Sequence, residues 1–242
     1  MQAVILAAGQ GRRLLPLTRE IPKSLLPVSS GGDTILELQV GILESLGVDE
    51  IIVVVGHGKD RVFSTLGPRV AYVENPDYLS TNSIYSFWLA SDMVGEDTLI
   101  LNGDVLFHPD VVGMLLDSSH EAVLSVDTGA ELDDESMKVR LEGERVAEIS
   151  KRIDPSVAQG ENLGIVRFRG DGLLMLKQTV SRMVESGDVN RWIPAAFQGM
   201  LEVHPVYAVD VRGLPWIEID FVEDLEKARN QVFSKIAGEL QL

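Results

Sequence analysis

Two patterns of apolar residues alternate along the first half of the chain. Short, continuous apolar runs predict strands covered on both faces, at residues 3–6, 51–55, 70–73, 98–101 and 122–126. Between them, apolar residues recur every three or four positions, which predicts helices ending near residues 46, 93 and 116. Asp33 or Thr34 is the expected N-cap of the first helix, and Ser80 or Thr81 that of the second.

The second half of the chain changes in style. Its predicted elements are short strands over residues 137–141, 145–149 and 164–168, a helix over 173–185, strands over 201–209 and 216–219, and a closing helix over 221–240. Strand–helix alternation followed by an antiparallel insertion predicts an α/β fold with a mixed, mostly parallel sheet in a single domain, residues 1–242. Ligands in such sheets bind beyond the carboxyl ends of the strands, so the loops there are the places to look for function.

Composition excludes several classes of protein. The chain has 242 residues and no cysteine, which rules out a disulfide scaffold, an iron–sulfur cluster, a thiol nucleophile and a cysteine zinc site. Its apolar runs are far shorter than the ~18 residues that span a bilayer, and the first residues carry no basic segment, so we expect a cytoplasmic protein. The net charge of −16 argues against nucleic acid and anionic membranes as partners.

One short basic region stands out in this acidic chain. Residues 1–30 carry four basic side chains and one acidic one, a net charge of +3, which indicates either a local anion site or ordinary surface charge. Gly9 and Gly11 follow the first strand, where backbone N–H groups can approach a phosphate. Leu14 breaks the dinucleotide motif, and the chain's Gly-Lys pair precedes Asp60 rather than the Ser or Thr of a Walker A loop. A phosphate loop that carries its own cations is the interpretation that remains.

Two aspartates follow predicted strands and are candidates for a metal site. Asp104 ends the segment Asn-Gly-Asp after the strand over 98–101, and Asp220 follows the strand over 216–219. Two carboxylates together with substrate phosphates are a usual way to hold Mg²⁺, which prefers oxygen ligands. The alternatives are that Asn-Gly-Asp is a simple turn and that Asp220 only caps the following helix.

The motifs together resemble a known family. LAAGQGRRLLPLT at residues 6–18, followed by PKSLLP at 22–27, is similar to the signature of the nucleotidyltransferases that activate sugar phosphates and small phospho-compounds. The similarity continues at residues 102–104, 161–165 and 216–225 and covers nearly the whole chain. Residues 75–78 and 81–86 make the chain most similar to the small cytidylyltransferases that act on phosphocholine, inositol-1-phosphate or phosphonates.

This resemblance implies a Rossmann-like, GT-A-like three-layer fold with a small antiparallel insertion. It implies Mg²⁺-dependent cytidylyl transfer from CTP to a small phosphate or phosphonate acceptor, with a nucleotide-binding part over residues 1–127, an acceptor-binding part over 128–220 and a closing helix over 221–240. A homodimer is left open. The residues implied to bind the nucleotide are Leu6, Ala7, Ala8, Gly9, Gly11, Arg12, Arg13, Lys23, Thr81, Asn82, Ser83 and Gly103.

The same resemblance assigns the remaining roles. Asp104 and Asp220 are the expected metal ligands, and the expected catalytic residues are Arg12, Lys23 and Lys151. The expected acceptor-binding residues are Asp127, Lys151, Gly164, Arg191, Trp192 and Glu218. The alternative for Lys151 is that it is an ordinary surface lysine with no role in the site.

Two alternatives and one departure qualify the expected function. A sugar-1-phosphate uridylyl-, thymidylyl- or guanylyltransferase would share these motifs, and a non-catalytic sensor would bind the nucleotide without turnover. Phosphocholine-type members carry an acidic residue after the helix that here ends near Glu185, whereas residues 190–197 contain no acid and include Arg191. We therefore expect a neutral or anionic acceptor.

Overall fold

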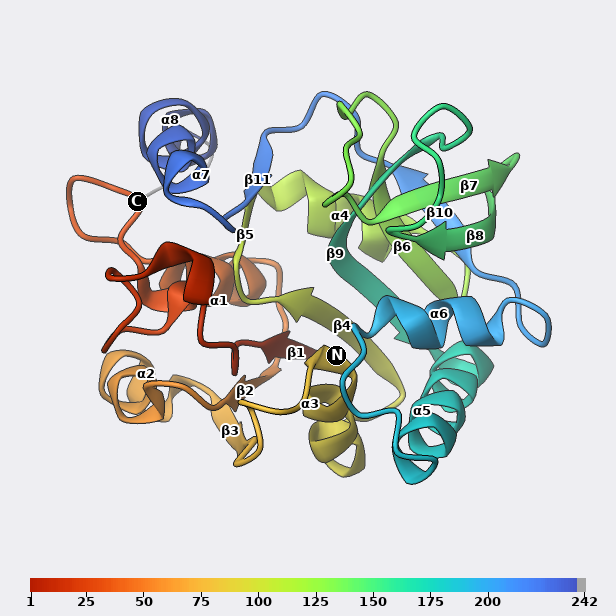
Figure 1. Cartoon of the computed structure of the whole chain (residues 1–242), viewed down its shortest axis with the longest axis horizontal. Coiled ribbons are helices and arrows are strands. Elements are labelled where there is room, and N and C mark those ends of the chain that lie inside the picture. Colours follow the sequence, from red (N-terminus) through yellow and green to blue (C-terminus); the bar gives the residue numbers. More distant parts are fainter. Residues whose placement is uncertain (239–242) are drawn as a thin grey trace.

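The computed structural model describes residues 1–238, and within them nine strands form one mixed sheet while two more form a separate ribbon. The order in the sheet is β3-β2-β1-β4-β9-β6-β10-β8-β7 (Figure 1). Its strands are β1 (Gln2–Leu6), β2 (Glu50–Val55), β3 (Ala71–Glu74), β4 (Asp97–Asn102), β6 (Ala122–Asp127), β7 (Lys138–Glu142), β8 (Arg145–Ser150), β9 (Gly160–Arg169) and β10 (Tyr207–Asp210). The ribbon pairs β5 (Val105–Phe107) with β11 (Trp216–Glu218).

The sheet has a parallel part and a mixed part. Strands β3, β2, β1 and β4 are parallel to one another, which brings their carboxyl ends to one edge. Strand β9 runs antiparallel to both β4 and β6, and the β7–β8 hairpin closes the far side as the small antiparallel insertion. Strand β2 is buried along Ile51–Val55, as expected for a strand covered on both faces.

Helices cover both faces of the sheet and produce the predicted three-layer arrangement. One face packs against α3 (Ser83–Ala90), α5 (Gly170–Glu185) and α6 (Pro194–Met200). The other packs against α1 (Ile35–Ser45), α2 (Lys59–Leu66) and α4 (Pro109–Asp117). Alternate residues of β1 enter the two cores, because successive strand side chains point to opposite faces: Val4 enters one, Ala3 and Ile5 the other.

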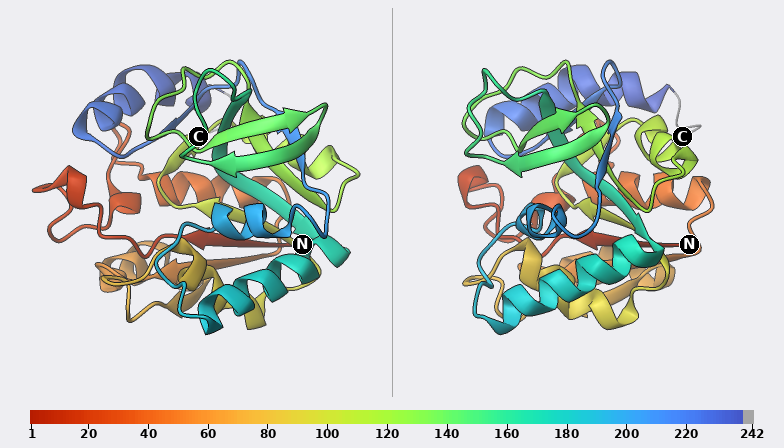
Figure 2. Two further views of the ribbon diagram at one scale, coloured as in Figure 1. Left: turned by 45° about the vertical axis from the view of Figure 1, so that its right-hand side comes forward. Right: turned by 90° about the vertical axis from the view of Figure 1, so that its right-hand side faces the viewer.

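The C-terminal helices brace the start of the chain. They are α7 (Val222–Lys227), a π-helical segment (Ala228–Val232) and α8 (Phe233–Ala237). Leu225 and Ile236 share a third apolar cluster with Leu14 and Leu26, so these helices pack against the glycine loop after β1. In the views of Figures 1 and 2, they and the β7–β8 hairpin lie at the top of the molecule, while α3 and α5 lie at the bottom. Residues 239 and 240 of the predicted closing helix lie outside the described part of the chain.

The structure corrects several sequence predictions. The strand over 201–209 was wrong for its first six residues: Leu201 and Val206 are buried, but they lie in the turns after α6, and β10 begins only at Tyr207. Periodicity also missed α2, α6 and β5. Helix α6 and strand β5 are too short to repeat an apolar pattern, and α2 buries only Val62 and Leu66. Thr34 caps α1 with a full capping box. The cap of α3 is Asn82 rather than Ser80 or Thr81.

Over residues 1–238, no helix has both the length and the apolar character needed to cross a membrane.

Candidate active site

A polar cavity lies at the carboxyl ends of β1 and β4. These strands are parallel neighbours with Leu6 opposite Asn102, so the loops that follow them start side by side. The Gly103 amide donates to the Leu6 carbonyl at 3.0 Å. A Cβ on Gly103 would lie 2.9 Å from the Ala7 Cβ, so only glycine permits this approach between the loops.

The glycine loop folds back around one lysine. Gly11 has a φ of +63°, a backbone conformation that favours glycine, and its carbonyl accepts a 2.7 Å hydrogen bond from the Thr18 hydroxyl. A Cβ there would lie 3.0 Å from the Lys23 Cβ, so the missing side chain of Gly11 makes room for the Lys23 stem. Lys23 itself begins a short 3₁₀ turn, Lys23–Leu25, which fixes its backbone.

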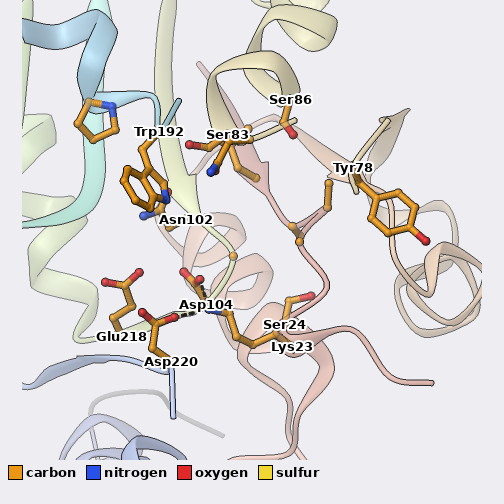
Figure 3. Close-up of a pocket in the computed structure, with 18 of the residues that line it drawn as sticks. Lys23, Ser24, Tyr78, Ser83, Ser86, Asn102, Asp104, Trp192, Glu218 and Asp220 are labelled. Carbon is orange, nitrogen blue, oxygen red and sulfur yellow. Dashed lines mark hydrogen bonds and ion pairs between the residues drawn. The ribbon is translucent and has the colours of Figure 1, made fainter. Parts of the chain in front are cut away.

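Lys23 lies between the two predicted metal ligands. Its Nζ is 2.6 Å from Asp104 Oδ2 and 2.8 Å from Asp220 Oδ1 (Figure 3). The β5–β11 ribbon brings the two aspartates together, because Asp104 precedes β5 and Asp220 follows β11 in an antiparallel pair. The Ile219 amide donates to the Asp104 carbonyl at 3.0 Å and locks this register. Residues far apart in the sequence thus form one ion-pair network.

Glu218 adds a third carboxylate to this group. Asp104, Glu218 and Asp220 each place an oxygen atom within 4.8 Å of those of the other two. Burial raises the pKa of Glu218 to about 8, and the negative charges of Asp104 and Asp220 add to the effect. Burial also raises the pKa of Asp220, but the charges of Lys23 and Arg13 lower it by more, so it lies below its ordinary value. The cluster holds more negative charge than Lys23 alone can balance.

The same oxygen atoms suit a hard divalent cation. Mg²⁺ prefers carboxylate oxygens and keeps several waters, so two or three carboxylates at one place are a fitting donor set. Asp104 Oδ1 is buried and accepts no hydrogen bond from any group within residues 1–238. A buried carboxylate oxygen without a donor is costly unless a further partner arrives, so the residues present fit a bound metal ion.

A second group of charges borders the first. The Arg13 guanidinium donates to Asp220 at 2.7 Å and to Glu135 at 3.0 Å. Lys151 reaches the same Glu135 at 3.3 Å, and its ammonium lies 4.9 Å from the centre of the Trp192 ring. The hydrogen bond from Arg13 is the largest contribution to a pKa of Glu135 below its ordinary value, and Lys151 adds to it. Glu135 therefore links two cations that the sequence assigned to different substrates.

Most of the predicted site residues line this cavity. They are Leu6, Ala7, Ala8, Gly9, Gly11, Arg13, Lys23, Thr81, Asn82, Ser83, Gly103, Asp104, Lys151, Trp192, Glu218 and Asp220. They come from both halves of the chain, and those expected to bind nucleotide lie at the end of β1, in the segments after β1 and β4 and at the start of α3. Trp192 is 51% exposed at the cavity rim.

Four predicted residues lie elsewhere. Arg12 is exposed and donates to the Gln10 side chain at 2.9 Å. Asp127 accepts a 2.9 Å hydrogen bond from the Trp216 indole, which gives it a structural partner.

Gly164 has a φ of +76°, and a Cβ on it would lie 2.2 Å from Asn102 Nδ2, so its role is to let β9 pass that side chain. Arg191 pairs with Asp188 at 3.5 Å and is not among the described residues that line the cavity.

Several lining residues were not among the predicted site residues: Ser24, Asn75, Tyr78, Ser86, Asn102, Met137, Asn162 and Pro194. A signal existed for some of them, since Asn102 and Asn162 stand in the motifs that carry the family resemblance. Asn75 donates to Ser86 at 3.0 Å, a buried contact between the segment after β3 and helix α3 that no local pattern predicts. Met137 and Pro194 carry no signal in the sequence.

Comparison with known proteins agrees with this geometry. The family model for the MobA-like NTP transferase domain matches residues 3–212. A stretch of 120 residues is 40% identical to the "CMP-5'-(3-aminopropyl)phosphonate synthase" of Streptomyces rubellomurinus, covering 48% of this chain and 19% of that protein. The "CTP:phosphoglutamine cytidylyltransferase" of Campylobacter jejuni is 25% identical over 93% of this chain and 98% of its own length.

A solved structure shares the fold over nearly the whole length. The inositol-1-phosphate CTP transferase from T. maritima superposes with a TM-score of 0.77 at 25% identity, covering 96% of this chain and 97% of that one. The chain spans 19% of the phosphonate synthase and 53–57% of the next three curated relatives. The family match covers most of the sequence, and the protein belongs to the MobA-like NTP transferase domain family. The predicted Rossmann-like nucleotidyltransferase fold is confirmed.

Proposed function

We propose that the protein transfers a cytidylyl group from CTP to a small phosphate or phosphonate acceptor and releases pyrophosphate. The observation that carries this proposal is Lys23, held between Asp104 and Asp220 beside the glycine loop. The names of the phosphonate synthase, the phosphoglutamine cytidylyltransferase and the inositol-1-phosphate CTP transferase support cytidylyl transfer among the activities of the family.

The reaction needs positioning and charge neutralisation more than proton transfer. An oxygen of the acceptor attacks the α-phosphorus, the bond to the bridging oxygen of the β-phosphate breaks, and pyrophosphate leaves. A phosphate monoester has a second pKa near 6, so about nine-tenths of its molecules are fully ionised at pH 7 and no general base is required. The barrier then depends on in-line alignment and on stabilising the developing negative charge.

The residues of the cavity divide this work between them. The glycine loop and Arg13 bind the triphosphate through backbone N–H groups and the guanidinium, and Arg12 remains a candidate for its outer phosphates. Lys23 and Lys151 offset charge at the α-phosphate and at the acceptor. Mg²⁺, held by Asp104 and Asp220, would neutralise phosphate charge when it is bound.

Asn82 is our candidate for reading the base. Its side-chain oxygen accepts the Ser83 amide at 2.8 Å as the N-cap of α3, which leaves its NH₂ group to donate. Cytosine offers O2 and N3 as acceptors on its pairing edge. We propose that this edge lies near Asn82 and the backbone of Ala7 and Ala8.

The acceptor is expected to be neutral or anionic, and the position of Lys151 supports this. Its ammonium already lies over the Trp192 ring, where a quaternary ammonium group would have to bind. We further propose that residues 1–127 bind the nucleotide and that residues 128–220 bind the acceptor.

The test is a pyrophosphate-release screen with Mg²⁺ that combines CTP, UTP, dTTP and GTP with phosphonates, polyol phosphates, sugar 1-phosphates and phosphocholine. We expect CTP to give the highest kcat/KM, with a phosphonate or polyol phosphate as acceptor and Asp104→Asn as the inactive control. A tenfold preference for UTP, dTTP or GTP with a sugar 1-phosphate would identify the sugar-nucleotide alternative. Nucleotide binding without turnover across the panel would favour the sensor, and phosphocholine as best acceptor would contradict the assignment of the Lys151–Trp192 pair.

A further inference from the structure

The Lys23 ammonium occupies the place where the proposed function puts a metal ion. Its distances of 2.6 and 2.8 Å to Asp104 and Asp220 are those of direct hydrogen bonds to the two expected metal ligands. The Lys23 side chain is only 14% exposed, so the charge lies inside the carboxylate group rather than at its edge. Figure 3 shows the lysine reaching from the glycine-loop side into the space between the two carboxylates.

We propose that Lys23 is a built-in cation that keeps metal out of the ligand-free site, so that the metal ion enters only with the nucleotide. The proposal rests on the proposed function and adds an order of events to it. Lys23 neutralises Asp104 and Asp220 while the site is empty. The triphosphate then draws its ammonium toward the glycine loop and frees the carboxylate oxygens for the metal.

Charge explains why the two cations exclude each other. A divalent ion bound to Asp104 and Asp220 would lie within a few ångströms of the ammonium, and in a site partly shielded from water this repulsion is strong. Without either cation, Asp104 and Asp220 would face each other beside Glu218 with little compensation. Arg13 cannot replace Lys23, because its guanidinium reaches Asp220 but makes no ion pair with Asp104 among the described contacts. The site therefore favours one cation at a time.

The surroundings of Lys23 allow the ammonium to move while its backbone stays. The Leu26 amide donates to the Lys23 carbonyl at 3.1 Å and holds the 3₁₀ turn, whereas the stem passes Gly11, which has no side chain to block it. The loop that carries Gly11 is also where the proposed function places the triphosphate. A nucleotide phosphate would thus offer the ammonium a new partner a short swing away.

The test measures Mn²⁺ binding to the whole protein, by following the EPR signal of free Mn²⁺, with and without CTP and with no acceptor present. Lys23→Met removes the charge and keeps the stem, and Lys23→Arg is the matched control that keeps the charge. Without CTP, we expect Lys23→Met to bind Mn²⁺ at least about tenfold more tightly than wild type and Lys23→Arg, the usual scale of a coupling between sites. Adding Asp104→Asn to Lys23→Met should abolish this binding.

Stability gives a second readout in case Lys23→Met folds poorly. Mn²⁺ should raise the melting temperature of Lys23→Met, or of the milder Lys23→Gln, and leave wild type unchanged, because only the variants bind it when ligand-free. Equal Mn²⁺ affinity of wild type and Lys23→Met without CTP would overturn the proposal. If wild type with CTP still gains a metal site that Asp104→Asn removes, the proposed function survives that result. If no such site exists even with CTP, the metal assignment itself is wrong.

Discussion

Two clusters of charged side chains lie at opposite ends of β4, and they are built differently. At its amino end, Arg167 donates to both oxygens of Asp97 at 2.9 and 2.8 Å and to the Leu116 carbonyl at 2.9 Å. Each guanidinium nitrogen has an acceptor, and the hydrogen bond from Arg167 is the main cause of a pKa of Asp97 below its ordinary value. One positive charge meets one negative charge, and both are satisfied by the protein.

At the carboxyl end of β4 the carboxyl groups outnumber the cations that pair with them. Asp104, Glu218 and Asp220 share Lys23, with help from Arg13 at Asp220 alone. The raised pKa of Glu218, near 8, and the unpartnered oxygen of Asp104 within the described residues are signs of this imbalance. The comparison teaches that a satisfied, partly buried ion pair supports the fold, whereas a group of carboxylates with an oxygen left without a donor can accept a ligand.

The largest effect on stability is expected at the satisfied cluster. Arg167→Met leaves Asp97 and several backbone carbonyls without their donor. Arg167 is buried but the Asp97 side chain is 34% exposed, so solvent screening reduces the cost to about 2 kcal/mol in the free energy of unfolding. Urea denaturation followed by circular dichroism measures the loss. We expect kcat to be unchanged at temperatures where the variant is folded, and Asp97→Leu in the same chain to restore part of the stability. A loss below about 1 kcal/mol would show that the pair is not structural.

The unsatisfied cluster should respond in the opposite way. Asp104→Asn and Asp220→Asn should each lower turnover at least about 100-fold, the scale of a lost major electrostatic contact. Their free energy of unfolding should change by less than about 1 kcal/mol, because weaker ion pairing to Lys23 is offset by less repulsion with Glu218. Steady-state kinetics with Mg²⁺ measure the turnover, and urea denaturation of the same preparations measures the free energy of unfolding. Near-normal Mg²⁺-dependent turnover in either variant contradicts the metal assignment.

Variants of Lys23 and Arg12 should separate effects on the chemical step from effects on CTP binding. Lys23→Ala should lower kcat by about tenfold or more and raise the KM for CTP by less, because its charge matters most as the α-phosphorus is attacked. Arg12→Ala should mainly raise the KM for CTP. An unchanged kcat in Lys23→Ala would mean that Lys23 does not stabilise the transition state.

The carboxylate cluster also makes a prediction about pH. The folded pKa of Glu218, about 8, lies above its ordinary value of 4.5, so the folded state binds the extra proton between these values. This carboxyl's contribution to stability is complete below about pH 4.5 and is lost as the pH rises through 8, with a slope of at most about 1.4 kcal/mol per pH unit. In EDTA, the unfolding free energy of Glu218→Gln relative to wild type should therefore rise from pH 5 to pH 8. A constant difference would contradict the raised pKa.

The elements nearest the motifs were predictable from sequence, because they rest on local signals. The run into β1, the glycines after it and the capping box at Thr34 each depend on a few adjacent residues. The pairing of β5 with β11 does not: both strands have three residues, too few for a periodic pattern, yet their register brings Asp104 to Asp220. Their positions after predicted strands and the family resemblance, not any sign of this pairing, suggested that the two residues share one site.

Two adjacent arginines also show what a sequence pattern cannot predict. Arg12 and Arg13 are equivalent in composition and charge, but the turn at Gly11 and the 3₁₀ helix Arg12–Leu14 send Arg13 into the carboxylate cluster and Arg12 toward solvent. Glu135 escaped the sequence reasoning altogether, because its loop carries no motif and its contacts come from distant elements. Side-chain direction in irregular segments depends on tertiary packing that a sequence pattern does not contain.

The most direct measurement of the central claim follows the α-phosphate of CTP through the reaction. With CTP labelled at that phosphate, Mg²⁺ and the best acceptor of the screen, wild type should move the label into a CMP-linked product and release one pyrophosphate for each product formed. Asp104→Asn, folded to the same extent, should leave the label in CTP. Label that stays in CTP or appears only as CMP with wild type, or equal product formation by Asp104→Asn, would contradict nucleotidyl transfer at this carboxylate cluster.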